Sequence, residues 1–404
     1  MIRRLRSSGV LSADWLPAFE SVDRAWFLPD LMWPYDMESR TSRPVDRGLD
    51  PGAWYSCADA DMPITVQWDD GDHRGSAPGR VATSSVSMPG VVASMLAHLD
   101  VRPGHRVLEI GTGTGWNAGL LTHRLGDGQV VTVEVDQAVA DAARARLHGH
   151  GLHPAVITAD GLLGHAPRAP FDRIIATAGL RRIPFAWVEQ TVPGGLIVAP
   201  WGTVFGNTDH IVRLTVSGDG RTASGHLSTP VEFMKVRSQR HSVDQTAYLP
   251  DGFPGGATTG STTLTAAALG VGDRMHHPFA TAAGLLITDC ALMADRRGSS
   301  VSTWLYSLNG DLSWAAAVLT DNTAESTVYQ SGPRRLWDEL ASAHRWWAGN
   351  GRPGPGRFGL TVTADGETIW LDTPGNPLPR TVGSQIPWPD LTNRGHPVAN
   401  WPQS

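Results

Sequence analysis

The chain has 404 residues and a formal net charge of −6, from 33 basic and 39 acidic side chains. Apolar residues make up 41% and charged residues 18%, a balance typical of a folded globular protein rather than a disordered one. At about 150 residues per domain this length suggests two or three domains, and the mildly acidic charge does not favour an electrostatic binder of nucleic acid.

Cysteine use and hydropathy give expectations about compartment. The two cysteines, Cys57 and Cys290, are too few and too far apart for a disulfide framework or a zinc site. The histidines at 148–153 lack acids or cysteines beside them, so we expect no metal site there. No apolar run reaches the roughly 18–20 residues of a membrane helix, and Ser-Ser-Gly follows the first arginines where a secretory signal would be apolar. We therefore expect a soluble, cytoplasmic protein with no membrane or nucleic-acid partner.

The first 86 residues are predicted to combine one helix with a long irregular region. Residues 9–30 carry apolar side chains at mixed three- and four-residue spacing, which indicates a helix that Pro29 closes. Residues 31–86 are rich in Asp, Gly and Pro, with one short apolar alternation at 64–66. A long loop in a compact domain is usually functional, so we expect residues 31–86 to form an extended loop or insertion.

From residue 87 onward, helices alternate with buried strands. A helix is expected from Ser87 to about Leu99, with Ser87 at the N-cap and Pro89 in the first turn. Strands then follow at intervals of roughly 20–30 residues, which implies a parallel, doubly wound sheet in an α/β fold. The predicted strands are 106–110, 130–135, 155–158, 173–177 and 194–200, and the predicted helices are 116–125 and 137–147.

The remaining chain is predicted to form a hairpin and a second domain. Strands at 211–216 and 231–236 are expected to close the sheet as a hairpin, joined at a Gly-Asp-Gly turn. Residues 241–260 are rich in Pro, Gly, Ser and Thr, which indicates a boundary. We therefore divide the chain into a first domain, 1–242, and an additional C-terminal α+β domain, 243–404. Expected elements of the second domain are 285–293, 302–308, a helix at 333–347 and a hairpin of 359–362 with 368–371.

The strongest chemical signal is a glycine-rich turn between a buried strand and a helix. Its residues are Gly111, Thr112, Gly113, Thr114 and Gly115. Backbone N–H groups in such a turn approach a ligand closely, and the helix N-terminus favours an anionic group. Glu134 ends the next strand, where an acid binds ribose hydroxyls. A loose dinucleotide fingerprint beginning at Gly113 also fits, but Glu109 inside the first strand favours S-adenosylmethionine, whose ammonium group gives a carboxylate a use.

Short motifs in a fixed order across residues 15–237 resemble the protein-L-isoaspartate O-methyltransferases, a family of class I S-adenosylmethionine enzymes with a Rossmann-like sheet. Ser85-Val86-Ser87-Met88-Pro89 resembles the Thr-Ile-Ser-x-Pro signature of that family. The glycine loop, the strand ending at Glu134 and the pair Asp160-Gly161 resemble its cofactor motifs. Further matching stretches lie at 18–29, 61–64, 169–172, 174–178, 183–184, 190 and 193–200.

The resemblance implies a role for each matching residue. Ser87 would hold the acceptor carboxylate near the methyl group, with Ser85 standing where the signature has threonine. Glu134 would bind the ribose, and Asp160 with Gly161 would lie at the adenine. Glu109 would either contact the cofactor or support it from behind. Two plainer interpretations stay open: Ser87 as a helix N-cap and Asp160 as a turn residue.

The implied reaction is the esterification of an aspartyl or isoaspartyl side chain. A carboxylate with a free pKa of about 4 is already ionised at neutral pH, so the reaction needs no strong general base. Alignment and desolvation of the nucleophile would supply most of the rate. The ester then activates its carbonyl, and attack by the next backbone nitrogen expels methanol and closes a succinimide.

Two departures from the shorter members of the family bear on the substrate. The segment between Pro63 and Ser87 is longer, and residues 241–404 are additional. In these two features the chain resembles methyltransferases associated with maturation of ribosomally made peptides in lanthipeptide, lasso-peptide and graspetide pathways. We therefore expect an aspartate of a constrained peptide to be methylated, leading to aspartimide or isoaspartate, with the second domain recognising the peptide. General isoaspartate repair and a non-catalytic peptide-binding adaptor are the alternatives, and the oligomeric state stays open.

Overall fold

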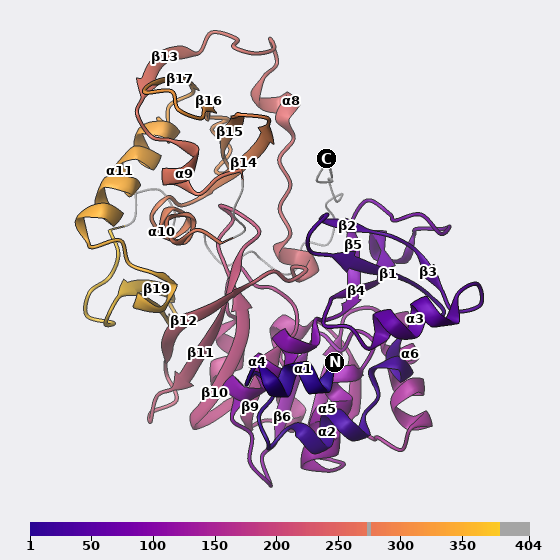
Figure 1. Cartoon of the computed structure of the whole chain (residues 1–404). Coiled ribbons are helices and arrows are strands. Elements are labelled where there is room, and N and C mark those ends of the chain that lie inside the picture. The colour runs from indigo at the N-terminus through magenta and orange to yellow at the C-terminus, as the bar shows by residue number, and fades with distance from the viewer. Residues whose placement is uncertain (273–275, 380–404) are drawn as a thin grey trace.

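The computed structural model describes residues 1–272 and 276–379, and its strands lie in three sheets (Figure 1). The largest has nine strands in the order β19-β18-β12-β11-β10-β9-β6-β7-β8. A small sheet near the N-terminus has the order β2-β1-β4-β5, with β3 paired to β1, and a third has the order β13-β17-β16-β15-β14. No helix in the described ranges combines the length and apolar character required to span a bilayer.

The large sheet contains the predicted parallel core. Its parallel strands are β6 (Val107–Ile110), β7 (Val130–Glu134), β8 (Ala155–Thr158), β9 (Phe171–Ala176) and β10 (Thr191–Trp201). The helices that accompany them are α4 (Pro89–Leu99), α5 (Trp116–Leu125), α6 (Gln137–Gly149) and α7 (Phe185–Glu189). The predicted α/β fold, a Rossmann-like doubly wound sheet with an additional C-terminal region, is confirmed.

Alternating side chains of these strands enter two separate cores. Val107, Val130 and Ile175 pack with apolar residues of α4, α5 and α6 on one face. Leu108 and Val131, each one residue further along, pack on the other face with α7 and the C-terminal helices. Burial on both faces explains why these strands are continuous apolar runs in the sequence.

The region before residue 87 differs from the expectation. The predicted helix at 9–30 is wrong: the chain there forms only α2 (Leu16–Ser21) and the 3-10 turn η1 (Arg24–Phe27), after a separate helix α1 (Ile2–Ser7). The Asp23 side chain accepts a hydrogen bond from Ala25 N and starts η1, which interrupts the helical spacing. The apolar side chains that suggested a helix are nevertheless buried, because this segment wraps around the core beneath α5.

The expectation of an irregular loop at 31–86 is wrong in part, since five short strands of this region form the small sheet; that the region is an insertion stays a prediction. Its elements are β1 (Leu31–Asp36), β2 (Thr41–Ser42), β3 (Val45–Asp46), α3 (Pro51–Ala58), β4 (Ile64–Trp68) and β5 (Ala82–Val86). The strands are short, β1 contains Pro34, and the β4–β5 pairing shifts register twice. Each irregularity breaks the two-residue alternation by which a strand is recognised.

The closing hairpin is displaced from its predicted position. It consists of β11 (Asp209–Val216) and β12 (Ala223–Val231), rather than 211–216 with 231–236. Ser217 N donates to Thr222 O, so the turn is tight and the second strand begins directly after it. Residues beyond Val231 are therefore free to leave the sheet and run along its edge.

The C-terminal region forms the third sheet and then returns to the first. The third sheet contains β13 (Thr258–Thr262), β14 (Cys290–Arg297), β15 (Ser300–Ser307), β16 (Trp314–Thr320) and β17 (Ser326–Ser331), accompanied by α10 (Pro278–Leu286) and α11 (Leu336–Gly349). The predicted segment 285–293 is thus divided between α10 and β14. The last hairpin, β18 (Phe358–Thr363) and β19 (Gly366–Leu371), pairs with β12 and extends the large sheet. Hydrogen bonding therefore crosses the division at residue 242, which itself stays a prediction.

Candidate active site

The glycine loop joins β6 to α5 at the carboxyl edge of the parallel strands. Gly111, Gly113 and Gly115 have φ values of +93°, +53° and +99°, a left-handed conformation that glycine adopts without strain. Gly115 occupies the N-cap of α5 and no side chain caps that helix. The first N–H groups of α5 are therefore available to an anionic ligand.

Glu134, at the end of β7, is fixed against this loop. Its Oε2 accepts a hydrogen bond from Gly113 N at 2.9 Å, and its Oε1 accepts from the N–H groups of Val135 at 2.9 Å and Asp136 at 3.1 Å. Each carboxylate oxygen can accept two hydrogen bonds, so Oε2 retains one acceptor position for a ligand hydroxyl. The structure thus brings the predicted ribose-binding acid and the predicted loop into direct contact.

Glu109 lies beneath the loop and is fully buried. Its carboxylate accepts hydrogen bonds from Thr132 Oγ1 at 2.6 Å and Asn117 Nδ2 at 2.7 Å. Burial raises the pKa of Glu109 to about 7, although the hydrogen bonds from Thr132 and Asn117 act in the opposite direction. Thr132 in turn shares a hydrogen bond with Thr112 of the loop, so this geometry favours the supporting role for Glu109.

Asp160 and Gly161 follow β8, the strand beside β7. The exposed Asp160 carboxylate accepts from Leu162 N at 2.9 Å and starts a short 3-10 turn, η3 (Gly161–Leu163). A Cβ atom at Gly161 would lie 2.5 Å from Ile110 Cγ2, so only glycine fits there without displacing β6. Asp160 therefore acts as a turn residue, as one of its two interpretations expects. Its exposed carboxylate also lies at the same sheet edge as Glu134.

The serine motif lies against the glycine loop. A Cβ atom at Gly113 would be 3.6 Å from Ser85 O and 3.8 Å from Ser84 Oγ, so the end of β5 and the loop are in close approach. Ser87 follows β5 directly and is half-buried. Within the described ranges its hydroxyl makes no hydrogen bond with the protein, which leaves it available to a ligand.

The predicted N-cap role of Ser87 is wrong. The N-cap of α4 is Met88, without a side-chain hydrogen bond, and Gly90 N instead donates to Asp61 Oδ1 at 2.7 Å. Asp61 reaches this helix end from the segment before β4, a contact between residues 29 positions apart. Because this contact is not local in sequence, the Ser-x-Pro pattern could not indicate that Asp61 accepts the hydrogen bond from Gly90.

Sequence analysis also missed Arg24, which holds the serine segment in place. This buried side chain donates to five backbone carbonyls, and two of the acceptors belong to Val86 and Ser87. The other three acceptors are Ala58, Ala60 and Met62, at 2.8–3.2 Å. Burial lowers the pKa of Arg24 to about 9, so it remains cationic at neutral pH. Arg24 lies within the family-matching stretch 18–29, but nothing local in the sequence indicated which carbonyls it would bind.

These contacts assemble one site from four separated segments. The uncapped helix end, the Glu134 carboxylate and the Asp160 turn follow the carboxyl ends of neighbouring parallel strands, and the segment that carries Ser87 approaches the glycine loop beside them. In such sheets, ligands bind outside the carboxyl ends of the strands. The donor set suits a small polar molecule that carries a carboxylate and a ribose. Among the residues that the structure describes, no group of three or more His, Cys, Asp or Glu side chains is arranged to hold a metal ion.

Comparison with known proteins covers the same region. The family model "Protein-L-isoaspartate(D-aspartate) O-methyltransferase (PCMT)" matches residues 59–241. A protein-L-isoaspartate O-methyltransferase of Methanopyrus kandleri is 40% identical over 140 residues, which are 34% of this chain and 62% of the relative. One from Methylorubrum populi is 39% identical over 155 residues, 38% of this chain and 71% of the relative. The chain thus spans less than two thirds of the first of these curated relatives.

One solved structure shares the fold over nearly the whole chain. A structure titled "Protein-L-isoaspartate O-methyltransferase" aligns with a TM-score of 0.51 and 19% identity, covering 92% of this chain and 98% of its own. The 92% coverage extends beyond the family match, so the shared fold includes most of the C-terminal region. The family match over the sheet edge that carries the site, together with 39% identity across 71% of a curated relative, shows that the chain belongs to the protein-L-isoaspartate O-methyltransferase family.

Proposed function

We propose that the protein is an S-adenosylmethionine-dependent carboxyl O-methyltransferase that esterifies an aspartyl or isoaspartyl side chain of a peptide or protein. The observation that carries this proposal is the position of Ser87. Its unpaired hydroxyl follows a strand that closely approaches the glycine loop, so an acceptor held there would face a cofactor held by the loop. Family membership supports the same reaction.

The residues at the sheet edge fit S-adenosylmethionine, which supplies an electrophilic methyl group when bound. The open N–H groups of α5 would receive its carboxylate, and Glu134 Oε2 would accept from a ribose hydroxyl. Asp160 and Gly161 would flank the adenine. Glu109 would keep the loop in shape through Thr132 and Asn117 rather than touch the cofactor.

The acceptor needs positioning more than activation. Its carboxylate is ionised at neutral pH, with a free pKa of about 4, so no residue has to remove a proton. The Ser87 hydroxyl would donate one hydrogen bond to the acceptor and orient its other oxygen, with Ser85 beside it. Arg24 would fix the backbone that carries Ser87 and thereby the angle of attack. The methyl ester would then close to a succinimide without further help from the protein.

Within this activity we propose an aspartate of a constrained ribosomal peptide as the substrate. The additional C-terminal region supports this, since a general repair enzyme has little to recognise beyond the damaged residue. A cavity of about 250 Å³ between the large sheet and α10 offers a place for a peptide side chain. Trp201, Phe205 and Phe279 line it, together with His210, whose pKa burial lowers to about 4, so His210 is neutral there.

General repair of isoaspartyl proteins is the second candidate. It is favoured by the solved structure that shares the fold across 92% of this chain, C-terminal region included. A domain that accompanies the family fold in that structure cannot by itself identify a peptide-maturation enzyme. The two candidates differ in substrate rather than in chemistry, so the choice is kinetic.

An assay with labelled S-adenosylmethionine and three peptides tests both the methyl transfer and the choice of substrate. One peptide is linear with isoaspartate, one is linear with aspartate, and one is cyclised with the same aspartate inside the ring. Transfer to at least one of them, lost in Ser87→Ala, is expected; no transfer to any of them favours the non-catalytic adaptor. Preference for the cyclised aspartyl peptide is the expected result for maturation. Equal or better turnover of the linear isoaspartyl peptide would leave a repair enzyme.

A further inference from the structure

Residues 233–240 form a strap along the candidate cofactor edge after the chain leaves β12. Gly179, in the loop after β9, donates to Met234 O at 2.8 Å and accepts from Val236 N at 3.0 Å. Gln239 Oε1 accepts from the N–H groups of Arg181 at 2.6 Å and Arg182 at 3.1 Å. One side of the strap is therefore fixed to the loop after β9.

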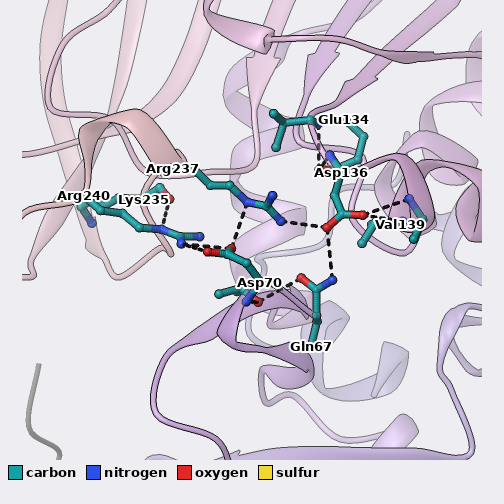
Figure 2. Close-up of polar contacts among 11 residues, drawn as sticks. Gln67, Asp70, Glu134, Asp136, Val139, Lys235, Arg237 and Arg240 are labelled. Carbon is teal, nitrogen blue, oxygen red and sulfur yellow. Dashed lines mark hydrogen bonds and ion pairs between the residues drawn. The ribbon is translucent and has the colours of Figure 1, made fainter. Parts of the chain in front are cut away.

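Arg237 carries the strap to the other side of the site (Figure 2). Its Nη2 lies 2.9 Å from Asp136 Oδ2, just beyond β7. In the sheet order β9-β6-β7, the strap is fixed beyond β9 and its Arg237 side chain pairs beyond β7, so this side chain spans the end of β6. The glycine loop begins at that end, so we place the Arg237 side chain over the position proposed for the cofactor.

The same guanidinium joins a third unit, the small N-terminal sheet. Arg237 Nε lies 2.9 Å from Asp70 Oδ1, in the turn between β4 and β5. Asp70 N donates to Thr83 Oγ1, which donates to Gln67 Oε1, while Gln67 Nε2 reaches Asp136 Oδ2 at 3.4 Å. Figure 2 shows the Arg237 head group reaching both Asp70 and Asp136, with Gln67 linked to Asp136. Since β5 leads to Ser87, this turn ties the acceptor side to the strap.

We propose that Arg237, Asp70 and Asp136 form a clamp that closes the cofactor site and sets how long the cofactor stays bound. The inference rests on the proposed function and assigns positioning residues, because none of the three is required to touch the cofactor. Arg237 pairs with both carboxylates at once, which fixes its geometry better than a single ion pair does.

The ion pairs of the clamp are weak enough to break and re-form. The side chains of Arg237 and Asp70 are 35% and 28% exposed, so water and salt weaken their ion pairs. Asp136 is less free to move, because its Oδ1 accepts from the N–H groups of Ala138 and Val139 and caps α6. Opening therefore proceeds by movement of Arg237 and of the Asp70 turn away from a fixed Asp136. A contact of this strength suits a site that must release its product after every turnover.

The test is the dissociation rate of S-adenosylhomocysteine from the full chain, measured by stopped-flow displacement. Arg237→Met and Asp70→Asn are each expected to release it about threefold to tenfold faster, the range for loss of a partly exposed ion-pair network. Arg240→Met is the matched control. Arg240 also contacts Asp70, at 2.9 Å, but leaves the bridge from Arg237 to Asp136 intact, so less than twofold change is expected.

Steady-state kinetics and salt dependence separate a clamp from a general structural role. Arg237→Met should raise KM for S-adenosylmethionine and leave kcat equal or higher, whereas a damaged active site would lower kcat. Salt should speed release from the wild type and have little effect on Arg237→Met. If Arg237→Met is poorly folded, Asp70→Asn provides the test, since it changes the other side of the ion pair, in the turn between β4 and β5.

The possible results distinguish failure of the clamp from failure of the proposed methyltransferase function. Folded Arg237→Met and Asp70→Asn proteins that release S-adenosylhomocysteine at the wild-type rate would overturn the clamp and leave the methyltransferase proposal standing. A wild-type protein that binds no S-adenosylhomocysteine would overturn both.

Discussion

Arg24 offers the sharpest test of how this site is held together. Replacing it with methionine keeps the apolar stem and removes the guanidinium that donates to five backbone carbonyls at 2.8–3.2 Å. A hydrogen bond from a charged donor is worth about 1.5–3 kcal/mol. Removing the buried cation also removes its desolvation cost of several kcal/mol, so a net loss of about 3–5 kcal/mol in the free energy of unfolding is expected.

The functional effect of Arg24→Met should be confined to the acceptor side. With Val86 and Ser87 no longer tied to the segment 58–62, the Ser87 hydroxyl loses its fixed position, and kcat should fall by at least about tenfold. The glycine loop and Glu134 make no hydrogen bond with Arg24, so affinity for S-adenosylhomocysteine should change less than about threefold. Arg24→Lys keeps the charge but reaches fewer carbonyls, and an intermediate effect is expected.

Urea unfolding measures the loss in the free energy of unfolding, and hydrogen exchange shows which segments become less protected. Faster exchange should appear in peptides covering 58–62 and 84–88, with little change in those covering 107–118. Calorimetry with S-adenosylhomocysteine then reports the cofactor side separately. An Arg24→Met protein with wild-type stability and wild-type turnover would refute the idea that Arg24 holds the backbone of Val86 and Ser87 in position.

Three further substitutions examine the site itself. Ser87→Ala should lower turnover well beyond any change in cofactor affinity, with a stability loss of less than about 0.5 kcal/mol because Ser87 is not a helix cap; a normal rate would exclude its acceptor role. Glu134→Ala should weaken binding of S-adenosylhomocysteine about tenfold to a hundredfold by calorimetry, and unchanged affinity would exclude Glu134 from the ribose. Glu109 has its pKa raised to about 7 in the folded state, so it binds more protons folded than unfolded, and its contribution to stability is present below about pH 4.5 and lost as pH rises through 7. Glu109→Gln should therefore flatten the fall in unfolding free energy between about pH 5 and 8, and an unchanged pH profile would contradict the raised pKa.

The parallel core was predictable because its signals are local. Most side chains of β6 and β7 are apolar and buried on both faces of the sheet, and the glycine loop carries its chemistry in five consecutive residues. The boundaries of α5 and β8 agree with the sequence expectation residue for residue. The proximity of Glu134 to the glycine loop was predictable for the same reason, because neighbouring parallel strands end at one edge of the sheet.

The small sheet and the supports of the site were not predictable in the same way. Proline and register shifts hide the strands before Ser87, and the alternation that defines a strand does not survive them. Arg24 and Asp61 act on residues 29–63 positions away, and Arg237 meets Asp136 across 101 positions. Such contacts depend on the folded path of the chain, which no local pattern in one sequence specifies.

The return of β18 and β19 to the large sheet has a consequence for biosynthesis. Ala223 pairs with Val362, so β12 keeps an open edge until the ribosome has made about 139 more residues. An uncovered strand edge can pair with another chain, and the nascent protein would carry this one through about a third of its synthesis. Ending the chain near residue 242 would make that exposure permanent. We expect such a shortened protein to aggregate even though it keeps every residue proposed for catalysis.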